Sequence, residues 1–403
     1  MRGILDVRPV PAADTHRTTM FEIFFDLVFV FALTRVITFM ADTPSALTLA
    51  QGLLLLVLLL YSWGPYTWVG NLVRPDVGPA RAATLVAMAA IFVAALVLPD
   101  AWRQGPELFD APFTLALAYV VGRAVQLVVL FWVSSTNPPL RSTLRFFSVP
   151  VTVAWIPLIV GALLGGTAQT VLWTVAFLVD IGGARIASSF RPWQLRSVDH
   201  FTERFGLVLI IALGESLISA GAGSSDAGPV GVGLAAALLG LTSTVCLWWL
   251  YFDRLAPAAR QAITNVPGER RADVAGDAYG LGHSPLIIGA IYVALGIEEV
   301  LDQLTDESPH AERLGWTAAT ALFGGTALYL LSRLVFRRIT VRAVYPTQVV
   351  AALLPLVLLP VGRSLPALAA LALLTVFLIG VTWYERRMDR RDDPIDPTRP
   401  LRP

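Results

Sequence analysis

Long apolar runs dominate this chain and limit what it can fold into. About twelve of them are roughly 18–22 residues long, the length that a helix needs to cross a hydrocarbon core of ~30 Å. Only 15% of the residues are charged, against ~25% in soluble domains. The sequence therefore predicts an all-α polytopic membrane protein of about 12 transmembrane helices. The expected spans are 20–40, 46–69, 81–99, 112–133, 146–165, 169–189, 203–222, 230–251, 280–299, 314–336, 345–361 and 364–384.

Arginines alternate along the predicted loops and orient the spans. The two tails and every second loop together hold 22 arginines, whereas the opposite loops hold only Arg103, Arg313 and Arg363. Cytoplasmic loops of membrane proteins carry the excess of basic residues. Both termini are therefore expected in the cytoplasm, and a missed span would have inverted the alternation.

Composition excludes several functional classes. A net charge of +1 gives no reason to expect a nucleic acid as partner. The single cysteine, Cys246, excludes an internal disulfide and a multi-cysteine metal site. The expected partners are membrane lipids and a small solute or ion of unknown identity, and the sequence leaves open whether the chain forms an oligomer.

Similar short motifs in the two halves suggest a parallel repeat of six plus six helices. Tyr119 and Arg123 in the fourth span have counterparts in Tyr329 and Arg333 of the tenth. Some transporters consist of two such halves, related by an axis along the membrane normal. The alternative is coincidence within an apolar chain of low complexity. The predicted parts are a first half with its tail at 1–197, a second half at 198–385 and a disordered tail at 386–403.

Two acids lie at the start of the first span. Glu22 and Asp26 are four residues apart, so they share one face of the helix. Ionisable groups inside a membrane are costly and usually face the protein interior or a water-filled cavity. Both are therefore candidates for a substrate or ion pathway. The alternative is that they lie at the cytoplasmic interface, where acids favour a helix N-terminus.

The seventh span carries three more charged candidates. Glu203 and Arg204 lie at its start, and Glu215 follows about 18 Å deeper along the helix. An acid at this depth is a candidate for function. The alternative for Glu215 is a structural hydrogen bond to a neighbouring helix.

Depth arithmetic selects partners for the buried charges. Asp180 in the sixth span and Arg123 in the fourth fall near the middle of the membrane, at the level of Glu215. We therefore expect Arg123 to pair with Asp180 or with Glu215. Arg185 lies nearer the cytoplasmic side, at a depth that suits Asp26.

Two histidines are candidates for a proton relay. His200 precedes the seventh span and His283 begins the ninth, and an unperturbed histidine titrates near neutral pH. For His283, a hydrogen-bonded histidine at the interface is the simpler interpretation. The tryptophans of the second and eighth spans are interpreted as interfacial anchors, namely Trp63, Trp68, Trp248 and Trp249.

Three stretches resemble the bacterial low temperature requirement protein A family. They are FEIFFDLVFVFALT at 21–34, HFTERFGLVLIIALGES at 200–216 and CLWWLYFD at 246–253. The resemblance implies a multi-pass protein of the bacterial inner membrane, and it implies no substrate. Arg35 departs from the residue that we expect of the family. The positions that fit its motifs are Glu22, Asp26, His200, Glu203, Arg204, Gly214 and Glu215.

The function that we expect is secondary transport of an unknown substrate. The buried acids could exchange protons, so the transport could be coupled to a proton. It predicts a cavity between the halves that is lined by Asp26, Asp180 and Glu215. One alternative is an ion channel or proton-conducting pore, and another is a structural or sensory membrane protein. An enzyme is not expected, because zinc-ligand spacing, a nucleophile elbow and a phosphate loop are missing from the sequence. No cofactor and no metal site are predicted.

Overall fold

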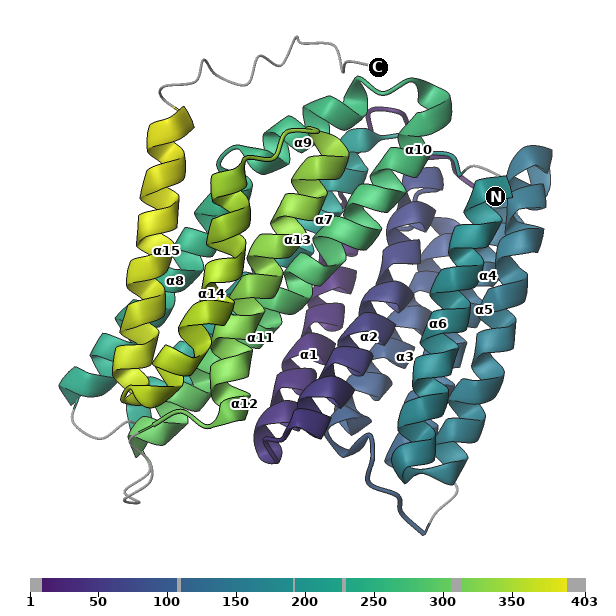
Figure 1. Cartoon of the computed structure of the whole chain (residues 1–403). Helices are drawn as coiled ribbons and strands as arrows, with labels where there is room; N and C mark the ends of the chain where they lie inside the picture. Colours follow the sequence, from purple (N-terminus) through teal and green to yellow (C-terminus); the bar gives the residue numbers. More distant parts are fainter. Residues whose placement is uncertain (1–8, 107–109, 191–192, 227–229, 306–312, 390–403) are drawn as a thin grey trace. The chain divides into compact units, whose positions relative to one another are not determined.

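The computed structural model describes residues 9–106, 110–190, 193–226, 230–305 and 313–389 (Figure 1). Nearly all of the regular structure in these ranges is helical, and the β-structure consists of two isolated bridges, Pro11 with Val73 and Arg313 with Pro366. Among the described residues, eleven helical segments are long and apolar enough to cross a membrane. An all-helical protein with many spans, as predicted, is therefore confirmed.

The helices follow one another with short connections. In chain order they are α1 (Met20–Asp42), α2 (Ala46–Leu72), α3 (Gly78–Val97), α4 (Ala111–Val133), α5 (Pro138–Leu164), α6 (Gly166–Phe190), α7 (Val198–Asp226), α8 (Val230–Phe252), α9 (Leu255–Thr264), α10 (Gly268–Asp277), α11 (Ser284–Thr305), α12 (Trp316–Ala319), α13 (Gly325–Thr340), α14 (Pro346–Ser364) and α15 (Ala367–Asp389). Two π-helical turns, Ala278–His283 and Thr320–Gly324, precede α11 and α13.

Eleven of the twelve predicted spans coincide with these apolar segments. The remaining predicted span is the seventh in chain order, 203–222, and it falls within α7. The side chains of 219–230 lie outside the described residues. The ninth predicted span, 280–299, lies inside a longer helical segment, Arg270–Leu304, which extends beyond it at both ends. The number twelve, the repeat and the cytoplasmic location of both termini stay predictions.

The chain divides into two compact units. Of the described residues, the first unit holds those within Met1–Phe39, Ala50–Leu207 and Gly268–Asp273, and the second holds those within Met40–Leu49, Val208–Pro267 and Val274–Pro403. The boundary therefore falls within α7, whose first turns belong to the first unit. The predicted division between residues 197 and 198 stays a prediction. So does the predicted tail at 386–403.

In the first unit, α5 and α6 form an antiparallel pair (Figure 1). Gly165 and Gly166 join them with φ angles of +71° and +54°, a conformation that side chains with a Cβ rarely adopt. Gly183 of α6 lies so close to α5 that a Cβ there would be 2.0 Å from Pro150. Small residues let membrane helices approach in this way, which strengthens their van der Waals contact.

In the second unit, α11 and α13 pack through a column of glycines. Gly282, Gly289 and Gly296 are seven residues apart, so they recur on one face. A Cβ on Gly289 would lie 2.6 Å from the backbone nitrogen of Tyr329, and one on Gly296 would lie 2.6 Å from that of Leu322. Backbone contact of this kind replaces the hydrophobic effect as the packing force between membrane helices.

Large apolar side chains cover the outer faces of several helices. Val128 of α4, Ile156 of α5 and Val376 of α15 are each about two-thirds exposed. Each of these side chains lies within a segment long enough to span a membrane, so lipid would cover it there. This pattern supports membrane lipids as the surroundings of both units.

Candidate functional site

Four charged or titratable side chains meet at one end of the first unit. Glu22 and Asp26 come from the start of α1, and His200 and Arg204 come from the start of α7. All four are buried, with at most 2% of each residue exposed. We call these four residues the charged cluster. The two sequence motifs that suggested them are almost 180 residues apart, and the fold joins their first turns.

Helix capping places two members of the cluster. Thr19 precedes α1, and its hydroxyl accepts from the backbone N–H of Glu22 at 3.3 Å while its own N–H donates to Glu22 Oε2 at 3.0 Å. This reciprocal pair is a capping box. Ser197 precedes α7 in the same way, and its hydroxyl accepts from the N–H of His200 at 3.2 Å. Glu22 and His200 are therefore each the third residue of a capped helix.

Arg204 binds both carboxylates of the cluster. Its Nε donates to Asp26 Oδ2 at 3.2 Å, and its Nη2 donates to Asp26 Oδ1. Its Nη1 lies 3.4 Å from Glu22 Oε1. On the other side, His200 Nε2 lies 2.8 Å from the same Glu22 oxygen. A fork of two donors on one carboxylate is the geometry at which arginine forms its strongest pairs.

The second helix supports this network. Trp63 Nε1 donates to Asp26 Oδ1 at 2.7 Å, and the indole is buried. The interpretation of Trp63 as an interfacial anchor is therefore wrong, because this ring serves a buried carboxylate. Gly70 leaves the space for Glu22, since a Cβ there would lie 2.2 Å from Glu22 Oε1. Asn71 connects to the start of α7 by donating to the carbonyl of Ser197 at 2.6 Å.

The cluster holds two carboxylates for one guanidinium, which proteins do not deprotonate. The second carboxylate, Glu22, also faces the ring of His200, which carries a positive charge only when it is protonated. A carboxylate inside a membrane protein is expensive unless a proton or another cation balances it. The arrangement therefore suits the uptake of a cation.

The N-terminal segment covers the cluster. The ring of His16 stacks on that of His200, with centroids 5.0 Å apart, and its backbone carbonyl accepts from the Ser197 hydroxyl at 2.7 Å. Burial and the neighbouring His200 lower the pKa of His16 from its ordinary value. Glu203 points away from the cluster and pairs with the exposed Arg17 at 3.3 Å. The predicted candidate Glu203 therefore lies at the rim of this site.

The expected pairing of Arg123 is confirmed. Its Nη2 donates to both oxygens of Asp180 at 2.9 Å, and its Nη1 donates to Gln126 at 2.8 Å. The depth argument left Asp180 and Glu215 as candidates, and the structure shows that Asp180 is the partner. Arg185 lies on α6, but Asp26, which its depth suited, binds Arg204 and Trp63 instead.

The remaining candidates belong to the second unit. Glu215 is buried on α7, and His283 is buried at the start of α11. The ring of His283 lies 5.1–5.8 Å from the rings of Tyr251, Tyr279 and Phe336. A cavity lined by Asp26, Asp180 and Glu215, and a relay from His200 to His283, would join the two units and stay predictions.

Sequence reasoning missed several residues that contact the cluster. His16 was not selected, because it lies before the first span and belongs to no motif. Gly70 and Asn71 lie at the end of an apolar run, where small and polar residues usually mark the start of a loop. Nothing in that pattern indicated that they contact a buried site. Trp63 offered a signal that was misread, since it lies nine residues before the end of α2, inside the helix rather than at its last turn.

Together these features define a multi-span helical membrane protein that buries a charged cluster at the starts of α1 and α7. The chain belongs to a family, the bacterial low temperature requirement A protein (LtrA) family, whose model matches residues 17–383. The resemblance noted from the motifs is thereby confirmed. The chain is also similar to "Uncharacterized protein RA0937" of Rhizobium meliloti (strain 1021), with 28% identity over 383 residues that cover 90% of this chain and 88% of that protein. No solved structure matches the chain.

Proposed function

We propose that this protein is a secondary transporter of the bacterial cell membrane and that the charged cluster binds its coupling cation. The observation that carries the proposal is that two carboxylates, Glu22 and Asp26, share the one guanidinium of Arg204 in a fully buried site, so that the second carboxylate needs a proton or another cation. A proton is the coupling ion that we expect, since acids and histidines inside membrane proteins commonly form proton pathways. The substrate is a small solute or ion.

Matching interactions in the two halves support a repeated transporter architecture. Arg123 of α4 pairs with an acid on α6, Asp180, and Arg333 of α13 pairs with an acid on α15, Glu385. These are the fourth and sixth spans of each predicted half. If the repeat is present, each half carries one arginine–carboxylate pair between the same two spans, buried in the first half and half-buried in the second. Two halves related in this way are the plan of several transporters.

The test measures cation exchange in membrane vesicles that contain the full chain. Everted vesicles are energised to make their interior acid, and a fluorescent weak base reports the proton gradient. Monovalent cations, divalent cations and small organic solutes are then added class by class. We expect one class to release the gradient in vesicles with the unchanged protein. Glu22→Gln and Asp26→Asn should abolish the release, because either change leaves the cluster neutral without a cation.

A matched carboxylate serves as the control. Asp100 pairs with Arg103 at 2.7 Å on the surface, with 45% of its side chain exposed. Asp100→Asn makes the same chemical change outside the cluster and should leave the release intact. A gradient that collapses without any added solute, together with single-channel steps in planar bilayers, would instead identify a pore. A gradient that no solute class releases would reject transport and favour a structural or sensory role.

A further inference from the structure

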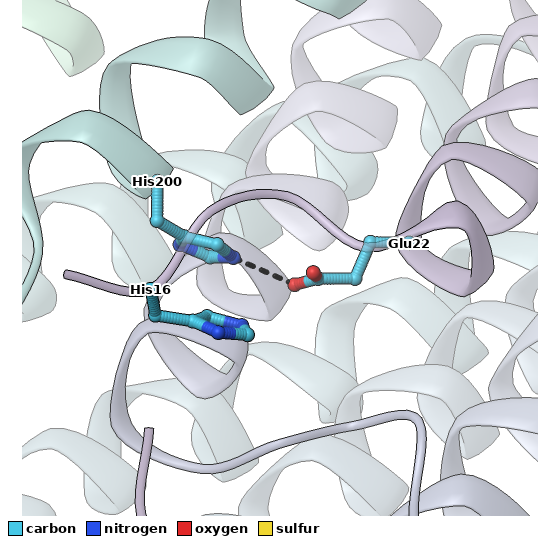
Figure 2. A group of neighbouring side chains, drawn as sticks. All are labelled: His16, Glu22 and His200. Atoms are coloured by element: carbon cyan, nitrogen blue, oxygen red, sulfur yellow. Dashed lines mark hydrogen bonds and ion pairs between the residues drawn. The ribbon is translucent and has the colours of Figure 1, made fainter. Parts of the chain in front are cut away.

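We propose that His16, Glu22 and His200 form a binding site for a divalent transition-metal ion of the Zn²⁺ type. Figure 2 shows the two imidazole rings one above the other, with both directed toward the carboxylate of Glu22. One ligand atom of each residue lies within 4.8 Å of the others. This proposal stands on its own geometry and does not need the transport function.

The distances suit an ion with a small adjustment of the side chains. Zinc binds imidazole nitrogen and carboxylate oxygen at about 2.0–2.2 Å, so two of its ligand atoms are at most ~4.3 Å apart. The pair formed by His200 Nε2 and Glu22 Oε1 is closer, at 2.8 Å. An ion would therefore separate this pair and draw His16 inward. His16 lies before α1, where a side chain can move without disturbing a helix.

An unsatisfied nitrogen points to a missing ligand. Nε2 of His16 is buried and has no hydrogen-bond partner among the described residues. Buried polar atoms are nearly always satisfied, and an exception needs an explanation. A metal ion that His16 shares with Glu22 and His200 would supply the partner. Asn71 contacts His200 at Nδ1, with its Nδ2 3.4 Å away, so the nitrogen that faces Glu22 and would bind the ion is Nε2.

The surrounding charges favour a cation. Glu22 and Asp26 share one guanidinium, and Arg204 directs two of its nitrogens at Asp26 rather than at Glu22. Arg204 Nη1 is 3.4 Å from the proposed ligand oxygen, which weakens the site without filling it. Two ion pairs lie near the proposed metal site, Arg74 with Asp76 and Arg17 with Glu203. Each pair is neutral as a whole, so it adds no net charge to the site.

The donor atoms indicate which ions fit. Calcium and magnesium prefer ligand sets made of oxygen alone. Two imidazoles and one carboxylate instead match zinc sites with an open fourth position and the triads that hold ferrous iron. Three protein ligands leave room for water or an exchanging ligand. A transition-metal ion is therefore the expected occupant, and magnesium is not.

Metal binding would also fasten three separate segments together. His16 belongs to the N-terminal segment, Glu22 to α1 and His200 to α7. Since a preformed site is absent from the unfolded chain, an ion that binds the folded state stabilises it by mass action. The site therefore predicts a higher unfolding temperature in the presence of zinc.

The test uses the full chain, purified in detergent and stripped with a chelator. Zinc chloride is titrated by calorimetry, and bound metal is counted by mass spectrometry after desalting. We expect one zinc ion per chain and no heat of binding with magnesium chloride. His16→Ala should weaken zinc binding at least about 10-fold, since loss of even an outer-shell partner costs 10–100-fold. Asp14→Ala, an exposed acid in the same segment, should bind zinc like the unchanged protein.

Folding controls keep the result interpretable. His16 lies outside the charged cluster, so His16→Ala is expected to give a single species on size exclusion and an unchanged unfolding temperature without metal. If it does not, His16→Gln is compared, which retains a polar side chain of similar reach. Unchanged protein that binds no zinc, or zinc binding that survives loss of His16, would overturn the proposal. Either result would leave the vesicle test of transport untouched.

Discussion

Arg204 is the member of the cluster whose positive charge is permanent, so its removal tests the electrostatic argument most directly. Arg204→Met keeps much of the side-chain volume but leaves Glu22 and Asp26 facing each other inside the protein. All three residues are at most 2% exposed, so water does not screen the loss. Removal of one partner from a buried ion pair costs ~3–5 kcal/mol. We expect a destabilisation of this size.

The assay is an unfolding titration with SDS in mixed micelles, followed by tryptophan fluorescence. Arg17→Met is the matched control, because Arg17 pairs with Glu203 while 67% of its side chain is exposed. Exposed pairs contribute ~0–1 kcal/mol. Adding Asp26→Asn to Arg204→Met should restore part of the stability, since it removes one of the two uncompensated charges. If Arg204→Met and Arg17→Met behave alike, the cluster is not the buried network described above.

Three further predictions use the same titration. Gly70→Ala should cost ~1–3 kcal/mol through overpacking, because its Cβ would meet Glu22, whereas Gly64→Ala in the same helix meets nothing within 4 Å and should be tolerated. Asp180→Asn should cost ~3–5 kcal/mol by leaving Arg123 buried without its carboxylate; a cost as small as that of a surface pair would contradict this. The hydrogen bond from Arg74 lowers the pKa of Asp76. This pair therefore stabilises the fold above the ordinary pKa and loses its effect as the pH falls through the lowered value, so Asp76→Asn and the unchanged protein should differ at pH 7 and converge only once the pH lies below that lowered value.

Much of the fold could be predicted because the bilayer imposes a length rule. Eleven of the expected spans coincide with observed helices, since an apolar run of about 20 residues has no other stable arrangement in lipid. Depth along a helix also narrowed the partner of Arg123 to Asp180 or Glu215, because rise per residue converts sequence position into height, and the structure shows the pair with Asp180. The same arithmetic failed for Arg185, because height says nothing about which helices are neighbours.

The candidate site shows a similar limit. Glu22, Asp26, His200 and Arg204 were all selected as charged residues at the ends of apolar runs. Their mutual contacts were not predicted, and neither was the help of Trp63, because the pairing of α1 with α7 depends on packing between segments far apart in the chain. His16 carries no local signal, since its importance comes only from its position over His200.

The sequence by itself determined that this is a helical membrane protein, which residues carry charge inside it and at what height, because hydropathy and helix geometry are local properties. Tertiary structure alone decided that the starts of α1 and α7 meet, so that two carboxylates share one guanidinium and two imidazoles flank Glu22. The physical reason is that side-chain contacts between distant helices depend on which faces pack together. In this chain those faces depend on close approach at small residues such as Gly70, which no periodicity in a uniformly apolar sequence distinguishes.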